Sequence, residues 1–235
     1  MRYHDIRPYS YNNVQIDSGH KYINASWIHI PELRFFIATQ GPIPNTIEDF
    51  WIMCNQYDVE KIIMLCELNE NNMEKCAKYW DPKLMNNFEI KTIEESDVSK
   101  GIKSRVFKLF DKYKNNSKKI HQMQLYGWVD HSDLNIDNFD KIIKLINFIN
   151  EKKTNKPVVV HCSAGVGRTG TFISLYNLFL EIMDQIRDNK KKTIEFSIFN
   201  LVRKIKELRM FMVENENQYI LLYSFVNYIL YNYNK

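Results

Sequence analysis

A cysteine, three glycines and an arginine lie within one short stretch of this sequence. Residues 158–172 read VVVHCSAGVGRTGTF, so an apolar run leads into Cys162 and then into a loop almost free of side chains. Gly165 and Gly167 let successive backbone N–H groups point inward, and a helix that follows adds the positive end of its dipole. The stretch therefore predicts a cradle for an anion.

Cys162 and Arg168 have complementary chemistry in such a cradle. Backbone dipoles and the guanidinium would stabilise the thiolate form of the cysteine over the thiol. The planar fork of Arg168 matches two oxygens of a phosphate-like dianion. A nucleophile beneath a bound phosphate predicts phosphoryl transfer through a covalent phosphocysteine. The alternative is an inert buried cysteine beside a glycine-rich turn. Arg168 and the Thr169-Gly170 pair that follows it argue against this alternative.

The composition sets limits on the class of protein. The 235 residues are 45% hydrophobic and 26% charged, as in a soluble globular domain with a sizeable core. The formal net charge of +4 favours anionic ligands without requiring nucleic acid. No apolar run approaches the roughly 20 residues that a membrane span needs, and we expect no signal peptide at the start.

Cysteine usage gives an expectation about metals and disulfides. The four cysteines lie at irregular spacings without a C-x-x-C pair: Cys54, Cys66, Cys76 and Cys162. This pattern argues against a disulfide framework and against a zinc site. It favours a reducing compartment, and we expect no metal and no cofactor.

Apolar patterning predicts the elements that must position the loop. Runs over residues 35–40, 61–67, 88–95, 104–110, 120–128 and 157–161 predict strands. Apolar spacings of three and four predict helices over residues 135–153, 169–186, 196–209 and 217–232. Together these predict an α/β (α+β) fold, a highly twisted mixed β-sheet flanked by helices, with the loop between a central strand and a helix. No repeat or linker interrupts residues 1–235, so we expect a single domain.

Several sequence motifs resemble those of a known family. HCSAGVGRTG resembles the H-C-x-x-G-x-x-R-[ST]-G loop of the cysteine-dependent protein tyrosine phosphatases, a loop shared with dual-specificity, lipid and RNA phosphatases. Five further segments, from residue 2 to about residue 230, resemble the tyrosine-specific branch: RYHDIRPY, YINASWI, FIATQGPIPNTIEDFW, EKCAKYW and NQYILLYSFV. The chain is therefore identified as a member of that branch.

The resemblance implies roles for the loop residues. Cys162 is the nucleophile, and Arg168 clamps the phosphate in the substrate and in the transition state. Thr169 hydrogen-bonds the leaving thiolate in the second step, and His161 orients Cys162 and lowers its pKa. Five residues between the nucleophile and the arginine line the phosphate site: Ser163, Ala164, Gly165, Val166 and Gly167.

The resemblance also implies a general acid. GWVDHSDLN (127–135) is similar to the family's mobile W-P-D-x-G-V-P loop, which makes Asp130 the acid and later the base. Val129 stands where the family has proline, and the Gly-Val-Pro that follows is also replaced. Because valine lacks the locked φ of proline, we expect altered loop dynamics and slower turnover with the acid retained. His131 and Asp133 are the alternative acids.

Residues outside these loops are assigned by the same resemblance. Tyr3 lines a slot deep enough for phosphotyrosine but too deep for phosphoserine, and Asp5 holds the backbone N–H of the substrate peptide. Gln218 positions the hydrolytic water. Glu214 replaces a second glutamine, and a carboxylate there favours slow phosphoenzyme hydrolysis or weaker substrate binding. Lys75 belongs with the substrate-binding residues and contacts Asp130 when the loop closes. The supporting residues are Glu70, which pairs with Arg168, and Trp128 and Arg209, which support the two loops.

The expected function is a metal-independent phosphatase, monomeric, acting on phosphotyrosine-containing proteins and binding phosphate or another oxyanion in its loop. We expect no nucleic-acid partner and no membrane span. Two alternatives stay open. Val129 and Glu214 favour a phosphotyrosine-binding substrate trap. The basic balance favours an RNA 5′-phosphatase, but Tyr3, Asp5 and Lys75 argue against it.

The source is also suggested by composition. The Asn-, Lys- and Ile-rich sequence is similar to the bracovirus tyrosine phosphatases that are delivered into insect cells. That resemblance implies a virus-encoded enzyme in the cytoplasm of the host cell, where it would act on phosphotyrosine signalling.

Overall fold

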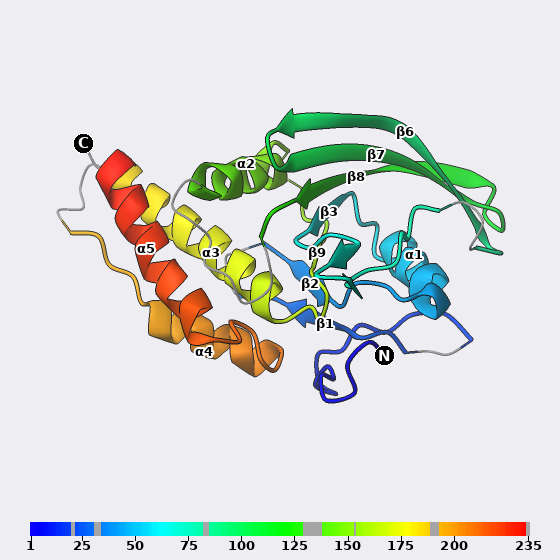
Figure 1. Cartoon of the computed structure of the whole chain (residues 1–235), viewed down its shortest axis with the longest axis horizontal. Helices are drawn as coiled ribbons and strands as arrows, with labels where there is room; N and C mark the ends of the chain where they lie inside the picture. Colours follow the sequence, from blue (N-terminus) through cyan, green and yellow to red (C-terminus); the bar gives the residue numbers. More distant parts are fainter. Residues whose placement is uncertain are drawn as a thin grey trace.

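Helices lie on both sides of a curved sheet in this computed structural model (Figure 1). The structure describes residues 1–19, 22–30, 34–81, 85–128, 138–152, 154–188 and 193–233. On one side of the sheet lies α1 (Ile47–Gln56), which follows the 3₁₀ turn η1 (Pro44–Thr46). On the other side lie α2 (Phe139–Asn150), α3 (Gly167–Arg187), α4 (Ile198–Leu208) and α5 (Glu216–Tyr233).

The sheet is mixed, which confirms the prediction. Its strand order is β1-β2-β9-β3-β8-β7-β6, and the four central strands of that order run parallel. These are β2 (Phe36–Thr39), β9 (Val158–His161), β3 (Lys61–Met64) and β8 (Asn116–Leu125). Antiparallel strands extend it at both ends: β1 (Ala25–Ile28) beside β2, and β7 (Ile102–Asp111) and β6 (Phe88–Ser99) beyond β8. A separate pair is formed by β4 (Asn69–Glu70) and β5 (Met73–Glu74).

The position of β9 decides where the anion loop lies. All four of its residues are buried, as the continuous apolar run predicts for a strand covered on both faces. It pairs in parallel with β2 and with β3, and His161 is level with Thr39 on one side and with Met64 on the other. Because the carboxyl ends of parallel strands meet at one edge, the segments after β2, β3 and β9 converge there.

The predicted strands and helices all appear, but some elements were missed and the bounds of others differ. The prediction omitted β1 and the helix α1, although apolar residues at 47, 50, 51 and 54 have helical spacing. The strand predicted over 88–95 continues to Ser99, and that over 120–128 runs instead over Asn116–Leu125. In both cases exposed polar residues pair through the backbone with β7, so an apolar pattern could not show the full strand.

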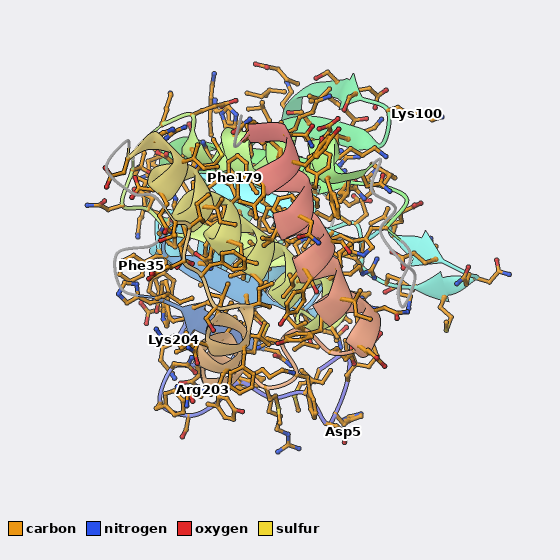
Figure 2. The ribbon with its side chains drawn as sticks, turned by 90° about the vertical axis from the view of Figure 1, so that its left-hand side faces the viewer. Asp5, Phe35, Lys100, Phe179, Arg203 and Lys204 are labelled. Carbon is orange, nitrogen blue, oxygen red and sulfur yellow. The ribbon has the colours of Figure 1, made fainter. Side chains whose placement is uncertain are left out.

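α3 is the central helix of the bundle. It starts directly after the loop, and α5 lies along it (Figures 1 and 2). The ring of Phe179 is 6.5 Å from that of Phe225 in α5, and the ring of Tyr176 meets Phe36 of β2 edge-on at 5.0 Å. Packing on these sides buries most of α3 and so holds its amino end at the edge of the sheet. Within the described residues, none of the helices has both the length and the apolar content needed to cross a membrane.

An aromatic cluster supports the sheet from the side of α1. Trp51 is fully buried, and its indole N–H donates to the carbonyl of Tyr79 at 2.7 Å. Its ring meets Tyr79 at 5.7 Å and Phe107 of β7 at 5.9 Å. Phe50 in the same helix lies 6.1 Å from the ring of His161. The cluster therefore links α1 to the residue that precedes the cysteine.

We expect Trp51→Ala to lower the free energy of unfolding by about 3–5 kcal/mol, because it leaves a cavity among fixed aromatic rings. Urea denaturation followed by circular dichroism measures the change. Tyr113→Ala is the matched control: that ring is 83% exposed, and its loss should shift the free energy by less than about 0.5 kcal/mol. Equal effects of the two substitutions would contradict the assignment of the cluster to the core.

Candidate active site

The anion loop is held in one conformation by its neighbours. Gly165 has φ +75°, and a Cβ at this position would lie 2.2 Å from the carbonyl oxygen of Thr39. Only glycine fits this backbone at this distance. The N–H of Gly41 donates to the carbonyl of Ser163 at 2.8 Å, which connects the loop to the end of β2. Gly170 N–H donates to the carbonyl of Val166 at 2.7 Å and begins the hydrogen bonding of α3.

Cys162 lies at the floor of the loop. Its side chain is only 3% exposed, and the N–H of Gly165 donates to its sulfur at 3.3 Å. The amino end of α3 begins at Gly167, so the positive end of the helix dipole is close by. A backbone donor and a helix terminus stabilise negative charge on the sulfur. The arrangement suits a nucleophilic thiolate.

Both ring nitrogens of His161 make contacts that fix the orientation of the ring. Nδ1 lies 3.1 Å from the carbonyl oxygen of Cys162. Because a carbonyl only accepts, Nδ1 carries the proton of the neutral ring. Nε2 then accepts from the hydroxyl of Tyr79 at 3.0 Å, and that hydroxyl in turn accepts from the amide of Gln122. The ring is thus fixed against the backbone of the cysteine.

Arg168 is almost fully buried and contacts two other elements. Its Nη1 donates to Oε1 of Glu70 at 2.7 Å and to the carbonyl oxygen of Trp128 at 2.7 Å. The same oxygen of Glu70 accepts from the N–H of Glu67 at 2.9 Å, which orients the carboxylate. These contacts fix the direction of the guanidinium and connect it to Trp128, next to the segment of the expected acid. That segment, with Val129, Asp130, His131 and Asp133, lies outside the described residues.

Arg209 connects the loop to β1. Its Nε donates to the carbonyl of Gly165 at 2.8 Å, and its two Nη groups bond Ser26 Oγ and Asn24 Oδ1 at 3.0 and 2.8 Å. A longer bond of 3.4 Å reaches the carbonyl of Ala164. Burial lowers the pKa of Arg209 to about 10, and the electrostatic interaction with Cys162 opposes that shift. The guanidinium therefore both shapes the loop and places positive charge behind it.

Gln218 and Glu214 converge on the amino end of α3. A Cβ added to Gly167 would lie 2.8 Å from Gln218 Nε2 and 2.8 Å from Glu214 Oε2. Gln218 is buried, and its Oε1 accepts from the backbone N–H of Glu214 at 2.8 Å. Glu214 is itself exposed. The structure thus places a carboxylate beside the phosphate cradle, where the resemblance has an uncharged amide.

Thr169 follows the arginine in the first turn of α3. It is fully buried, and its Oγ1 makes no hydrogen bond within the described part of the chain. A buried hydroxyl without a partner is uncommon, and one near a functional loop is a candidate for a transient bond during the reaction.

Arg2 is a positioning residue that the sequence interpretation missed. Its Nε and Nη2 donate to the carbonyls of Gly41 and Pro42 at 3.2 and 2.9 Å, and its Nη1 reaches the carbonyl of Glu74 at 2.9 Å. These bonds attach the amino-terminal segment to the loop after β2. They bring the hydroxyl of Tyr3 to 3.1 Å from Ser163 Oγ. The sequence did contain a clue to this role, because Arg2 belongs to the RYHDIRPY segment that resembles the family.

Two other expected residues differ in their surroundings. Asp5 is exposed and extends from the edge of the molecule, clear of the helices (Figure 2). Lys75 is 8% exposed, and its backbone N–H bonds the carbonyl of Leu68 at 2.8 Å. The residue that the resemblance assigns as its contact, Asp130, lies outside the described ranges.

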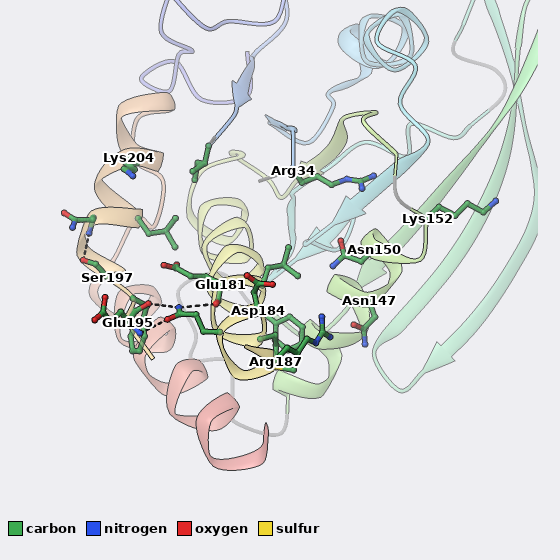
Figure 3. Close-up of a pocket in the computed structure, with 18 residues that line it drawn as sticks. Arg34, Asn147, Asn150, Lys152, Glu181, Asp184, Arg187, Glu195, Ser197 and Lys204 are labelled. Carbon is green, nitrogen blue, oxygen red and sulfur yellow. Dashed lines mark hydrogen bonds between the residues drawn. The ribbon is translucent and has the colours of Figure 1, made fainter. Parts of the chain in front are cut away.

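A large surface cavity, of about 1260 Å³, lies away from this site (Figure 3). It is formed by the ends of α2 and α3 and the start of α4, with Gln185 bonding both the carbonyl and the N–H of Glu195. Both acidic and basic side chains line the cavity, so it does not present the uniformly positive surface that would attract a phosphate. Its charged lining residues are Arg34, Lys152, Glu181, Asp184, Arg187, Glu195 and Lys204.

The fold and the loop together define a class of protein, one that binds a phosphate-like group over a cysteine at the amino end of a buried helix. The chain belongs to the protein-tyrosine phosphatase family, whose model matches residues 1–228. It is 34% identical over 238 residues to tyrosine-protein phosphatase non-receptor type 20 of Rattus norvegicus, covering 98% of this chain and 54% of that protein. It therefore spans about half the length of this curated relative.

A solved structure shows the same architecture. The catalytic domain of human protein tyrosine phosphatase non-receptor type 18 superposes with a TM-score of 0.86 at 29% sequence identity, covering 97% of this chain and 83% of that one. A second structure, of PTPN18 in complex with HER2-pY1196 phosphor-peptides, has a TM-score of 0.86 at 28% identity and covers 97% and 80%.

We expect Glu70→Ala to lower the free energy of unfolding by about 3–5 kcal/mol, because it removes a carboxylate that balances the buried charge of Arg168. Binding of vanadate should weaken as well, since the guanidinium loses its orientation. Glu74→Ala, which removes an exposed carboxylate paired with Arg2, should change stability by no more than about 1 kcal/mol. Urea denaturation and vanadate titration measure both. A Glu70 variant as stable as the Glu74 variant would contradict this account.

Glu214→Gln should tighten the binding of inorganic phosphate roughly fivefold, because removing an exposed charge beside an anion is worth about 1 kcal/mol. The inhibition constant of phosphate is the measurement. Glu216→Gln, two residues away in the first turn of α5, is the control and should leave that constant unchanged. Unaltered binding in the Glu214 variant would mean that its carboxylate does not face the bound anion.

Proposed function

We propose that this chain is a protein tyrosine phosphatase that hydrolyses phosphotyrosine in proteins through a phosphocysteine intermediate. The observation that carries the proposal is the sulfur of Cys162, 3% exposed beneath a loop whose Gly165 N–H points at it, with buried Arg168 at the end of the same loop. Charge develops at fixed positions in phosphoryl transfer, and donors already aimed at those positions stabilise it.

In the first step the thiolate of Cys162 attacks phosphorus. The S–P bond forms as the bond from phosphorus to the tyrosyl oxygen breaks. Asp130 donates a proton to that oxygen, so tyrosine leaves as the neutral phenol. Arg168 and the loop N–H groups stabilise the charge on the equatorial oxygens. No metal is required, because these donors supply the positive field.

In the second step water hydrolyses the phosphocysteine. Asp130, now a carboxylate, takes a proton from the water as its oxygen bonds to phosphorus and the S–P bond breaks. Gln218 positions that water, and its place beside Gly167 supports the role. Thr169 donates its unpartnered hydroxyl to the leaving thiolate of Cys162, and inorganic phosphate is released.

The depth of the cysteine supports phosphotyrosine as the substrate. Cys162 is only 3% exposed, so a phosphate on a long aromatic side chain reaches it more readily than one on the short side chain of phosphoserine. Tyr3, at hydrogen-bonding distance from Ser163, is placed to line one wall. Asp5, two residues after Tyr3 and exposed, accepts a backbone N–H of the substrate peptide. The structure of PTPN18 in complex with phosphor-peptides supports phosphorylated proteins as substrates of the present chain as well.

The domain organisation, oligomeric state, location and origin of the protein are proposed from the sequence. Residues 1–235 form one catalytic domain that acts as a monomer, without nucleic acid, in the cytoplasm. The Asn-, Lys- and Ile-rich composition supports a virus-encoded origin similar to the bracovirus enzymes, with phosphotyrosine signalling in the host cell as the target.

A substrate trap is the second candidate, and the carboxylate of Glu214 beside Gly167 favours it. A negative charge there repels hydroxide and the phosphate of the intermediate. The protein would then bind phosphotyrosine, transfer the phosphate to Cys162 and release it slowly.

Rapid-mixing kinetics with a phosphotyrosine peptide separate the two candidates. We expect sustained turnover, abolished by Cys162→Ser and reduced about 10²–10⁴-fold by Asp130→Ala. Asp133→Ala is the control for the acid and should retain most activity. The same peptide carrying phosphoserine should not be hydrolysed.

A burst of one equivalent of product followed by a stall would instead support the trap. Full activity in the Cys162→Ser variant would overturn the phosphocysteine mechanism.

A further inference from the structure

Three potential metal ligands meet directly beneath the anion loop. The sulfurs of Cys66 and Cys76 and a ring nitrogen of His161 all lie within 4.8 Å of one another. The three residues are 1%, 1% and 0% exposed. They come from different parts of the sheet edge: two residues beyond β3, two residues beyond β5 and the last residue of β9. The proposed reaction uses neither of the two cysteines.

The backbone holds this cluster together. Met64 pairs with His161 in the parallel register of β3 and β9, and the N–H of Leu65 donates to the carbonyl of His161 at 2.8 Å. The N–H of Cys76 bonds the carbonyl of Leu68 at 3.3 Å. The register of β3 and β9 therefore brings Cys66 and His161 together, and the bond to Leu68 holds Cys76 beside them.

The protonation of His161 suits metal binding. Its Nδ1–H is directed to the carbonyl of Cys162, which leaves the lone pair on Nε2. A histidine that binds a metal through one nitrogen commonly donates the other N–H to a backbone carbonyl, which fixes the tautomer. Here Nε2 accepts from the hydroxyl of Tyr79 at 3.0 Å, so its lone pair points away from the backbone of Cys162.

We propose that Cys66, Cys76 and His161 form a binding site for a soft divalent cation, Zn²⁺, behind the catalytic cysteine. Two thiolates and an imidazole are preferred ligands of this ion, at about 2.3 Å for sulfur and about 2.0–2.1 Å for nitrogen. Ligands spaced within 4.8 Å approach such distances with shifts of about 1 Å. The irregular spacing of these residues in the sequence hid the site, because no two of them form a metal motif.

Charge and protons balance on binding. Both thiols release their protons to solvent and become thiolates, and their two negative charges neutralise the cation, so the loaded site can remain buried. In the metal-free protein the Cys76 thiol donates to the carbonyl of Ala77 at 3.3 Å, a bond that the ion would replace. Binding replaces the Tyr79 bond to Nε2 and keeps the bond from Nδ1 to Cys162, which couples the site to the nucleophile.

The test uses the full chain carrying Cys162→Ser, so that the nucleophilic thiolate cannot bind the metal. Co²⁺ is the probe, since its thiolate complexes show a sulfur-to-cobalt charge-transfer absorption. We expect one equivalent of Co²⁺ to produce that absorption and one equivalent of Zn²⁺ to remove it. Adding Cys54→Ser, which replaces a buried cysteine elsewhere, should leave the signal intact, and adding Cys66→Ser should abolish it.

Thermal unfolding provides a second readout that does not depend on the absorption. Zn²⁺ should raise the Tm of the Cys162→Ser protein and of its Cys54→Ser derivative, but not of its Cys66→Ser or Cys76→Ser derivatives. No thiolate absorption in the Cys162→Ser protein, or a signal that survives Cys66→Ser, would overturn the proposal. Because the Cys162→Ser chain has no turnover, this result is independent of whether the protein is a phosphatase.

Discussion

The structure depends on one constraint: the backbone N–H of Gly165 must point at the sulfur of Cys162. A chain can do this only if it reverses sharply between a strand and a helix, and Gly165 permits the turn because it adopts φ +75° against the carbonyl of Thr39. The parallel neighbours of β9 place that carbonyl there. The burial of α3 holds the helix terminus in register with the loop. The sheet, the turn and the helix therefore act together to hold the loop in one conformation.

Charge in the site is arranged around this loop. Two arginines approach it from different sides, Arg168 held by Glu70 and Arg209 held by β1 and the preceding loop. Both are fully or almost fully buried, so their fields are weakly screened at the cradle. The carboxylate of Glu70 balances Arg168, but Arg209 has neutral partners, which is why burial lowers its pKa. The result is net positive character where a dianion would bind.

Much of the site could be expected from the sequence. The loop, its nucleophile and the contact between Glu70 and Arg168 follow from motifs whose residue types are needed for phosphate binding. Harder to predict was Arg2, because its partners Gly41, Pro42 and Glu74 lie far from it along the chain. The helix α1 was missed because its apolar spacing lay within a segment interpreted only as a motif. The extended ends of β6 and β8 carry exposed polar residues, so their pairing with β7 left no apolar pattern to read.

The sequence by itself determined the chemistry of the loop and the class of fold, because a nucleophile, glycines and an arginine at fixed spacing act within a single turn of the chain. Only the tertiary structure decided which distant residues surround that loop. Cys66, Cys76 and His161 are irregularly spaced, yet they meet because β3 and β9 end at the same edge of the sheet. The physical reason is that local geometry is set by neighbouring residues, whereas strand order and register decide contacts across the chain.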